Sequence, residues 1–129
     1  MTKGHPMAKL AIQVKTTGEV TELDLTADSL TTLQTAVGGW VQAIDLSDTL
    51  SMWCNEEGKL ISLPHNPYAQ AMWDEVFGAQ TDYLVGDVVF TGGTDDEGMT
   101  LGLDEVTAKK VLNSIAKTSQ FVSPRITII

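Results

Sequence analysis

Residues 9–25, KLAIQVK-TTGE-VTELDL, decide the fold class of this chain. Apolar and polar residues alternate through 9–15 and again through 20–25, and this period of two is typical of half-buried β-strands. The four residues 16–19 between them contain a glycine and indicate a tight turn. The stretch therefore predicts a β-hairpin at the start of a folded domain.

Three helices are predicted among the strands that follow. The clearest start is Asn66-Pro67, because Asn is a good N-cap and Pro suits the first helical position. Glycines after the last turn close the first two helices. The third helix begins with acidic residues, which complement the helix dipole. The predicted ranges are 29–37, 67–77 and 104–117.

Strand patterns fill most of the remaining sequence, and Trp40 and Trp73 are expected in the core. The predicted strands cover 40–46, 50–55, 60–63 and 82–90. Strands mixed with three helices predict one α+β domain with a mainly antiparallel sheet. The expected boundaries are a loose leader over 1–7, the domain over 8–120 and a strand-like tail over 121–129.

The net charge of −9 is concentrated in one part of the sequence. Lys59 and Lys109 are consecutive basic residues with nine acids between them, and the other eight acids are balanced by eight bases. Contacts to phosphates or anionic lipids need clustered Lys and Arg, so direct binding to nucleic acid or to membranes is disfavoured.

Two alternatives remain open for this acidic stretch. It is either a solvated surface that resists association, or an acidic face that binds a basic partner such as a host protein. An exposed Trp53 would also mark an interface. The candidate interaction residues are Asp74, Glu75, Asp82, Asp87, Asp95, Asp96, Glu97 and Trp53.

No catalytic or metal-binding motif stands out. Cys54 lies in an apolar stretch, and His5 and His65 are the only histidines, so we expect a buried, inert thiol. The acidic segment 95–98 lacks the ligand spacing of an EF-hand. We therefore expect no metal, no cofactor, and a binding protein rather than an enzyme. A single cysteine and the lack of an apolar leader favour the cytoplasm.

His65 and Asn66 are the pocket candidates. They precede a predicted helix, where Asn66 either serves only as the cap or forms, with His65, the rim of a ligand pocket. The tail residues 126–129 are β-prone and apolar. We expect them to pair with their own sheet or, in a homodimer, with a second subunit.

Several short segments, taken in order, carry a family resemblance. They are VGGW at 37–40, CNEEGK at 54–59, LPHN at 63–66, DYLVGDVV at 82–89 and LDE at 103–105. Their order resembles an uncharacterised domain-of-unknown-function family, number 3846, found in actinobacteria, their phages and mobile elements. The resemblance covers about residues 8 to 117. It implies an accessory protein acting in a bacterial host cytoplasm, and supplies no reaction or catalytic residue.

Two functions follow from these observations. The first is a non-enzymatic binding protein of a phage or mobile element that modulates a host factor through its acidic surface, with counter-defence as one such role. The alternative is a protein that binds or sequesters a small molecule, with a pocket near His65 and Trp53.

Overall fold

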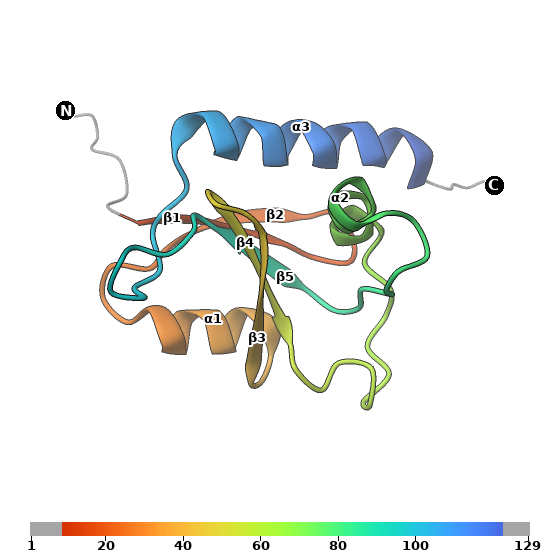
Figure 1. Ribbon diagram of the computed structural model, residues 1–129. Helices are drawn as coiled ribbons and strands as arrows, with labels where there is room; N and C mark the ends of the chain where they lie inside the picture. The colour runs from red at the N-terminus through yellow and green to blue at the C-terminus, as the bar shows by residue number, and fades with distance from the viewer. Residues whose placement is uncertain (1–8, 123–129) are drawn as a thin grey trace.

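A five-stranded sheet packed between helices forms the domain (Figure 1). The computed structural model describes residues 9–122, with the backbone alone at 121 and 122. The elements are β1 (Leu10–Val14), β2 (Val20–Asp24), α1 (Ser29–Val37), β3 (Val41–Ser47), β4 (Leu50–Asn55), α2 (Pro67–Phe77), β5 (Val88–Thr91) and α3 (Glu105–Val122). No helix in this part of the chain is long and apolar enough to span a membrane.

The strand order is β2-β1-β5-β4-β3, and every neighbouring pair is antiparallel. The last strand in sequence, β5, therefore lies at the centre. Phe90 in β5 faces Ile12 of β1 on one side and Met52 of β4 on the other. The predicted single α+β domain with an antiparallel sheet is confirmed.

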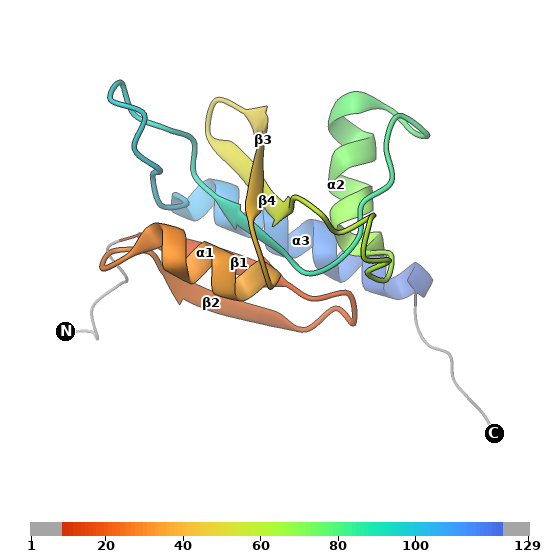
Figure 2. The same cartoon turned by 90° about the horizontal axis from the view of Figure 1, so that it is seen from below.

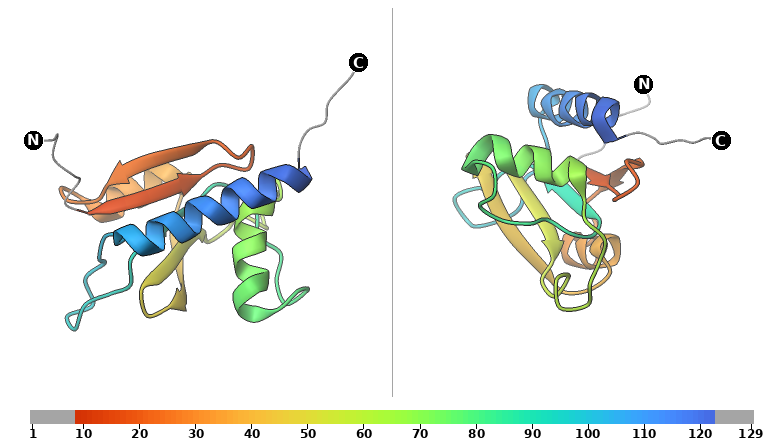
Figure 3. Two further views of the ribbon diagram at one scale, coloured as in Figure 1. Left: turned by 90° about the horizontal axis from the view of Figure 1, so that it is seen from above. Right: turned by 90° about the vertical axis from the view of Figure 1, so that its right-hand side faces the viewer.

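Helices cover both faces of the sheet. α2 and α3 lie on one face and α1 on the other (Figures 1 and 3). The larger core cluster joins α2 and α3 to the sheet, and the smaller one gathers under α1. β1 was expected to be half-buried, but α1 also covers its second face. Gln13 on that face is buried and donates from Nε2 to the Ala36 carbonyl of α1 at 3.0 Å.

The helix ends follow the predicted signals closely. Asp28 caps α1 by accepting from the Thr31 N–H at 3.1 Å, and Asn66 caps α2. Asp104 accepts from the Thr107 N–H at 2.7 Å just before α3. α3 runs five residues further than the predicted 117, into the first residues of the expected tail. The leader residues 1–7 and the tail residues 123–129 lie outside the described range, so the tail-mediated homodimer stays a prediction.

One strand prediction is wrong, and another is right only over its second part. Residues 60–62 form turns in place of a strand, and the Leu63 N–H after them donates to the Gly58 carbonyl at 3.0 Å. β5 starts at residue 88 instead of 82 because residues 84–86 pair with 64–66 outside the sheet. Gly86 has a φ of +79°, which an extended strand does not accept.

Several apolar side chains expected inside are exposed. Trp40 precedes β3, and its side chain is 66% exposed. Leu30 on α1 and Leu112 on α3 also face solvent, because each helix buries a narrower stripe than its apolar residues suggest.

Candidate functional site

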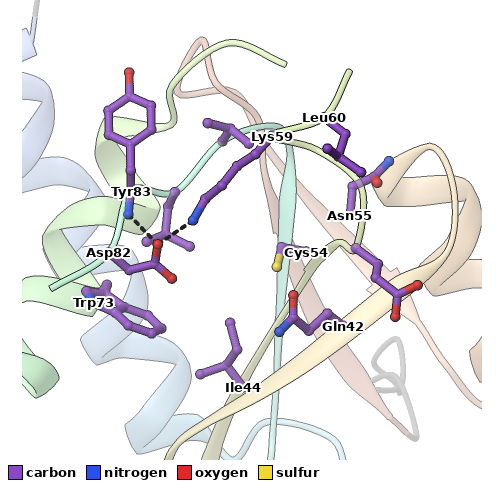
Figure 4. Close-up of a pocket in the computed structure, with 12 residues that line it drawn as sticks. Gln42, Ile44, Cys54, Asn55, Lys59, Leu60, Trp73, Asp82 and Tyr83 are labelled. Carbon is purple, nitrogen blue, oxygen red and sulfur yellow. Dashed lines mark hydrogen bonds and ion pairs between the residues drawn. The ribbon is translucent and has the colours of Figure 1, made fainter. Parts of the chain in front are cut away.

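A cleft of about 330 Å³ opens where β3 and β4 meet the start of the 56–60 turn, α2 and the segment 82–85 (Figure 4). Gln42 and Ile44 come from β3, Cys54 from β4 and Trp73 from α2. Lys59 and Asp82 stand opposite each other within it, so we call it the Lys59–Asp82 cleft. The close-up shows the Trp73 indole, the Gln42 amide and the Cys54 sulfur around its centre.

The one ion pair of the cleft joins Lys59 to Asp82. The same Asp82 carboxylate accepts from the Tyr83 N–H at 2.7 Å. The hydrogen bond from Lys59 and then that of Tyr83 lower the pKa of Asp82. Both side chains are well exposed, so the pair contributes little to stability. The lowered pKa keeps the Asp82 carboxylate charged at neutral pH.

The aromatic rings near segment 82–85 are held in place by stacking and by side-chain hydrogen bonds. His65 and Tyr83 stack with ring centroids 4.5 Å apart, and His65 Nε2 lies 3.1 Å from Gln70 Oε1. Trp73 donates from Nε1 to Thr81 Oγ1 at 2.7 Å. The cleft is therefore bordered by a wall whose aromatic groups have defined positions.

Exposed large side chains stand at the cleft mouth, with Tyr83 on the aromatic wall and Leu60 across from it (Figure 4). Leu60 is 84% exposed, and Ile61 and Tyr83 are each 56% exposed. The turn that carries Leu60 and Ile61 is closed by backbone hydrogen bonds, including Ile61 N–H to Glu57 at 3.1 Å. We call Leu60, Ile61 and Tyr83 the apolar rim. These large apolar groups stand in solvent beside a preformed cleft.

Cys54 is buried, as expected, and burial raises the pKa of its thiol, with Asp82 as a smaller contributor. Within the described part of the chain, the polar and aromatic partners of the His65 side chain are Gln70 and Tyr83, and Cys54 is not among them. A thiol that resists ionisation is a poor nucleophile.

Asn66 is a structural residue and does not line the cleft. Its side chain is fully buried. Oδ1 accepts from the N–H groups of Tyr68 and Ala69, while Nδ2 donates to the carbonyls of Val14 and Gly86. Of the two pocket candidates, His65 supports the aromatic wall and Asn66 holds the framework.

Trp53 lies on the α1 face, away from the cleft. It is half-buried in the smaller core cluster and donates from Nε1 to Thr91 Oγ1 at 2.9 Å. The tryptophan of the cleft is Trp73, which packs against the larger core cluster, where the sequence predicted it, and also lines the cleft. The alternation in 50–55 indicates that Trp53 and Cys54 face opposite ways, but it does not say which face meets which helix.

The acidic candidates occupy separate places. Asp82 is in the cleft, and Gln70 Nε2 donates both to Asp74 Oδ1 and to the Asp82 carbonyl. Asp87 accepts from the Thr16 N–H at 3.1 Å. Asp95 organises its own turn by accepting from Glu97 and Met99.

The turn that contains Asp95, Asp96 and Glu97 lies at the opposite end of the molecule from α2, which carries Asp74 and Glu75 (Figures 1 and 2). An acidic stretch that is continuous in sequence is thus divided in space. Across residues 9–122, no three His, Cys, Asp or Glu side chains are grouped to hold a metal ion.

Comparison with known proteins places the chain in a family. No curated protein and no solved structure shows significant similarity to it. A family model described as "Domain of unknown function (DUF3846)" matches residues 7–116, nearly the whole described domain, and the cleft lies inside this range. The chain belongs to this domain-of-unknown-function family, as the order of its sequence landmarks indicated.

Proposed function

We propose that this protein is a non-enzymatic accessory protein of a phage or mobile element that binds a protein of its bacterial host in the host cytoplasm. The binding site is the Lys59–Asp82 cleft with its apolar rim. The acidic side chains then act as charge complements to a basic partner rather than as one continuous face.

The observation that carries this proposal is the apolar rim beside a preformed cleft. Large apolar side chains that gather in solvent around a concave site often mark a binding surface. Aromatic and aliphatic anchors that enter pockets supply most of the energy of protein interfaces. Leu60, Ile61 and Tyr83 are such anchors, exposed next to a cavity that a partner side chain can fill.

Charge favours a basic group on the partner. Asp82 and Glu56 line the cleft together with a single base, Lys59. A net charge of −9 on the chain would also accelerate encounter with a basic protein. An enzyme is less well supported, because Cys54, the nucleophile candidate in the cleft, has a raised pKa.

A pull-down from host lysate tests the proposal. The bait is the wild-type protein, the double variant Leu60→Ala/Ile61→Ala, or Leu30→Ala. Leu30 is a matched control, since it is 53% exposed but lies on α1 across the sheet. We expect one host protein to be retained by wild type and Leu30→Ala and lost with the double variant. Equal retention by all three baits would contradict the proposal.

A second candidate function is small-molecule binding in the same cleft, which Trp73 and Tyr83 line and which His65 borders through its stacking on Tyr83. A volume near 330 Å³ falls at the lower end of the range of ligand sites. Native mass spectrometry of protein purified from the host distinguishes the two functions. A retained small molecule that is lost in Trp73→Ala supports this candidate, whereas its absence together with a retained protein supports the first.

A further inference from the structure

We infer that a second cavity, the groove between α2, α3 and the β3–β4 turn, binds a small organic anion that carries an apolar portion. The groove has a volume of about 660 Å³ and shares no lining residue with the Lys59–Asp82 cleft. This site is independent of the proposed function, and its volume is suitable for a small ligand.

The local charge of the groove is opposite to that of the chain. Lys110 and Lys117 line it from α3, and Glu75 is its single acidic lining residue. The two lysines are seven residues apart, which places them on one side of the helix. The ion pairs within residues 9–122 are Lys15–Glu19 and Lys59–Asp82, so neither groove lysine has a carboxylate in contact there. A groove of net positive charge on a protein of net charge −9 selects an anion.

The other residues that line the groove favour a ligand with an apolar part. Leu50 and Met72 belong to the main core, and the partly exposed Val76 continues this surface. Thr49 and Asn113 add polar groups at the wall. A carboxylate, sulfonate or phosphate group between the lysines, with its apolar body on this floor, satisfies both kinds of lining. Glu75 disfavours a ligand with several negative charges, such as nucleic acid.

Anilinonaphthalenesulfonate, a fluorescent aromatic monoanion, tests the inference on the folded protein. N-phenylnaphthylamine is its uncharged analogue. We expect the anionic dye to bind more tightly than the neutral one. In the double variant Lys110→Gln/Lys117→Gln, the Kd of the anionic dye should rise about threefold to tenfold. A rise of this size corresponds to the loss of two exposed ion pairs. Lys109→Gln is the matched control, because Lys109 lies on α3 but not in the groove, and its Kd should stay unchanged.

Near-UV circular dichroism must show native packing in each variant, because partly unfolded proteins also bind this dye. Titrations in the Leu60→Ala/Ile61→Ala background remove dye binding at the apolar rim. The inference is overturned if the neutral dye binds as tightly, or if the double lysine variant binds the anionic dye like wild type. It is also overturned if light scattering shows a wild-type dimer that the lysine substitutions dissociate, since a second copy would then cover the groove.

Discussion

The side chain of Asn66 uses its full hydrogen-bonding capacity inside the protein. Nδ2 donates to the Val14 carbonyl at the end of β1 and to the Gly86 carbonyl, at 3.1 and 2.9 Å. Oδ1 accepts from the first N–H groups of α2. One residue thus joins the sheet, the helix and the segment that forms the aromatic wall of the cleft.

Replacing Asn66 by Ala should lower the free energy of unfolding by about 2–4 kcal/mol. The helix loses its cap, and two buried carbonyls lose their donors. Urea unfolding followed by circular dichroism measures the loss. Asn66→Asp keeps the cap acceptor but removes both donors, so we expect it to be no more stable than Asn66→Ala. Asp28→Ala, a cap at an exposed position, should cost less, and an equal cost would show that capping alone explains the effect.

The Lys59–Asp82 pair should make stability depend on acid pH. The pKa of Asp82 is lowered from its ordinary value of 3.8, so its stabilising effect is complete above that value and is lost as pH falls through the lowered pKa. Wild type should therefore lose more stability than Asp82→Asn below about pH 4. The difference should be under about 1 kcal/mol because both partners are exposed. Urea midpoints at several pH values measure it, and identical pH profiles would refute it.

At the scale of the elements, local signals predicted better than long-range ones. The ends of α1 and α2 were predictable because they depend on local residues. Asp28 and Asn66 cap the starts of the two helices, and Gly38 and Gly78 follow their last turns. The prediction of a strand at 60–63 was wrong because the apolar residues there lie in and after an exposed turn. The start of β5 depends on pairing between residues 64–66 and 84–86, which the sequence pattern does not reveal.

The cleft was predictable only in part. The sequence drew attention to His65 and Asp82, both of which lie at or behind its wall. It did not reveal that Lys59 reaches across to Asp82, 23 residues away. Nor did the sequence show that Trp73, rather than Trp53, lines the cleft. Each is an apolar residue whose neighbouring element the sequence pattern does not identify. Such assignments require the tertiary arrangement of the strands.

Gly93 is placed where two loops cross at close range. A Cβ atom on Gly93 would lie 2.1 Å from the Asp48 carbonyl oxygen, whereas one on Gly38 would meet nothing within 4 Å. The sequence Gly92-Gly93 is typical of a flexible turn, but Gly93 is buried and its carbonyl accepts from the Leu101 N–H. Here glycine is required for space rather than for flexibility.

Gly93→Ala should therefore destabilise the protein by about 3 kcal/mol, as expected when a side chain is forced into packed backbone. Gly38→Ala is the matched comparison. Gly38 ends α1 with a φ of +80°, so alanine there should cost only about 1 kcal/mol of backbone strain. Thermal and urea unfolding of both variants measure the two costs. A larger cost at Gly38 would contradict the crossing argument.

Over the whole molecule, charge is distributed more evenly in space than in sequence. The acids of the 94–100 turn and those of α2 lie at opposite ends (Figure 2). The lysines of α3 lie beside the α2–α3 groove. The acids therefore do not form a single face, and Glu75 of α2 lies in a groove where Lys110 and Lys117 give a net positive charge.

This distribution predicts that the protein does not bind duplex DNA at physiological salt. Lys15 and Lys59 are already paired with carboxylates, which leaves Lys9 and the three lysines of α3 among the described bases. Lys3 and Arg125 lie outside the described residues. Few phosphate contacts can form, and the net charge of −9 repels the DNA as a whole.

Fluorescence anisotropy of a labelled duplex at about 0.15 M salt measures this directly. We expect no saturable change up to about 100 µM protein, the weak end of ordinary non-specific DNA affinity. A Lys110→Glu/Lys117→Glu variant should give the same flat titration, because removing bases cannot weaken binding that is absent. Micromolar binding that weakens with added salt and disappears in this variant would show that the α3 lysines contact phosphate, and the groove would then be a nucleic-acid site.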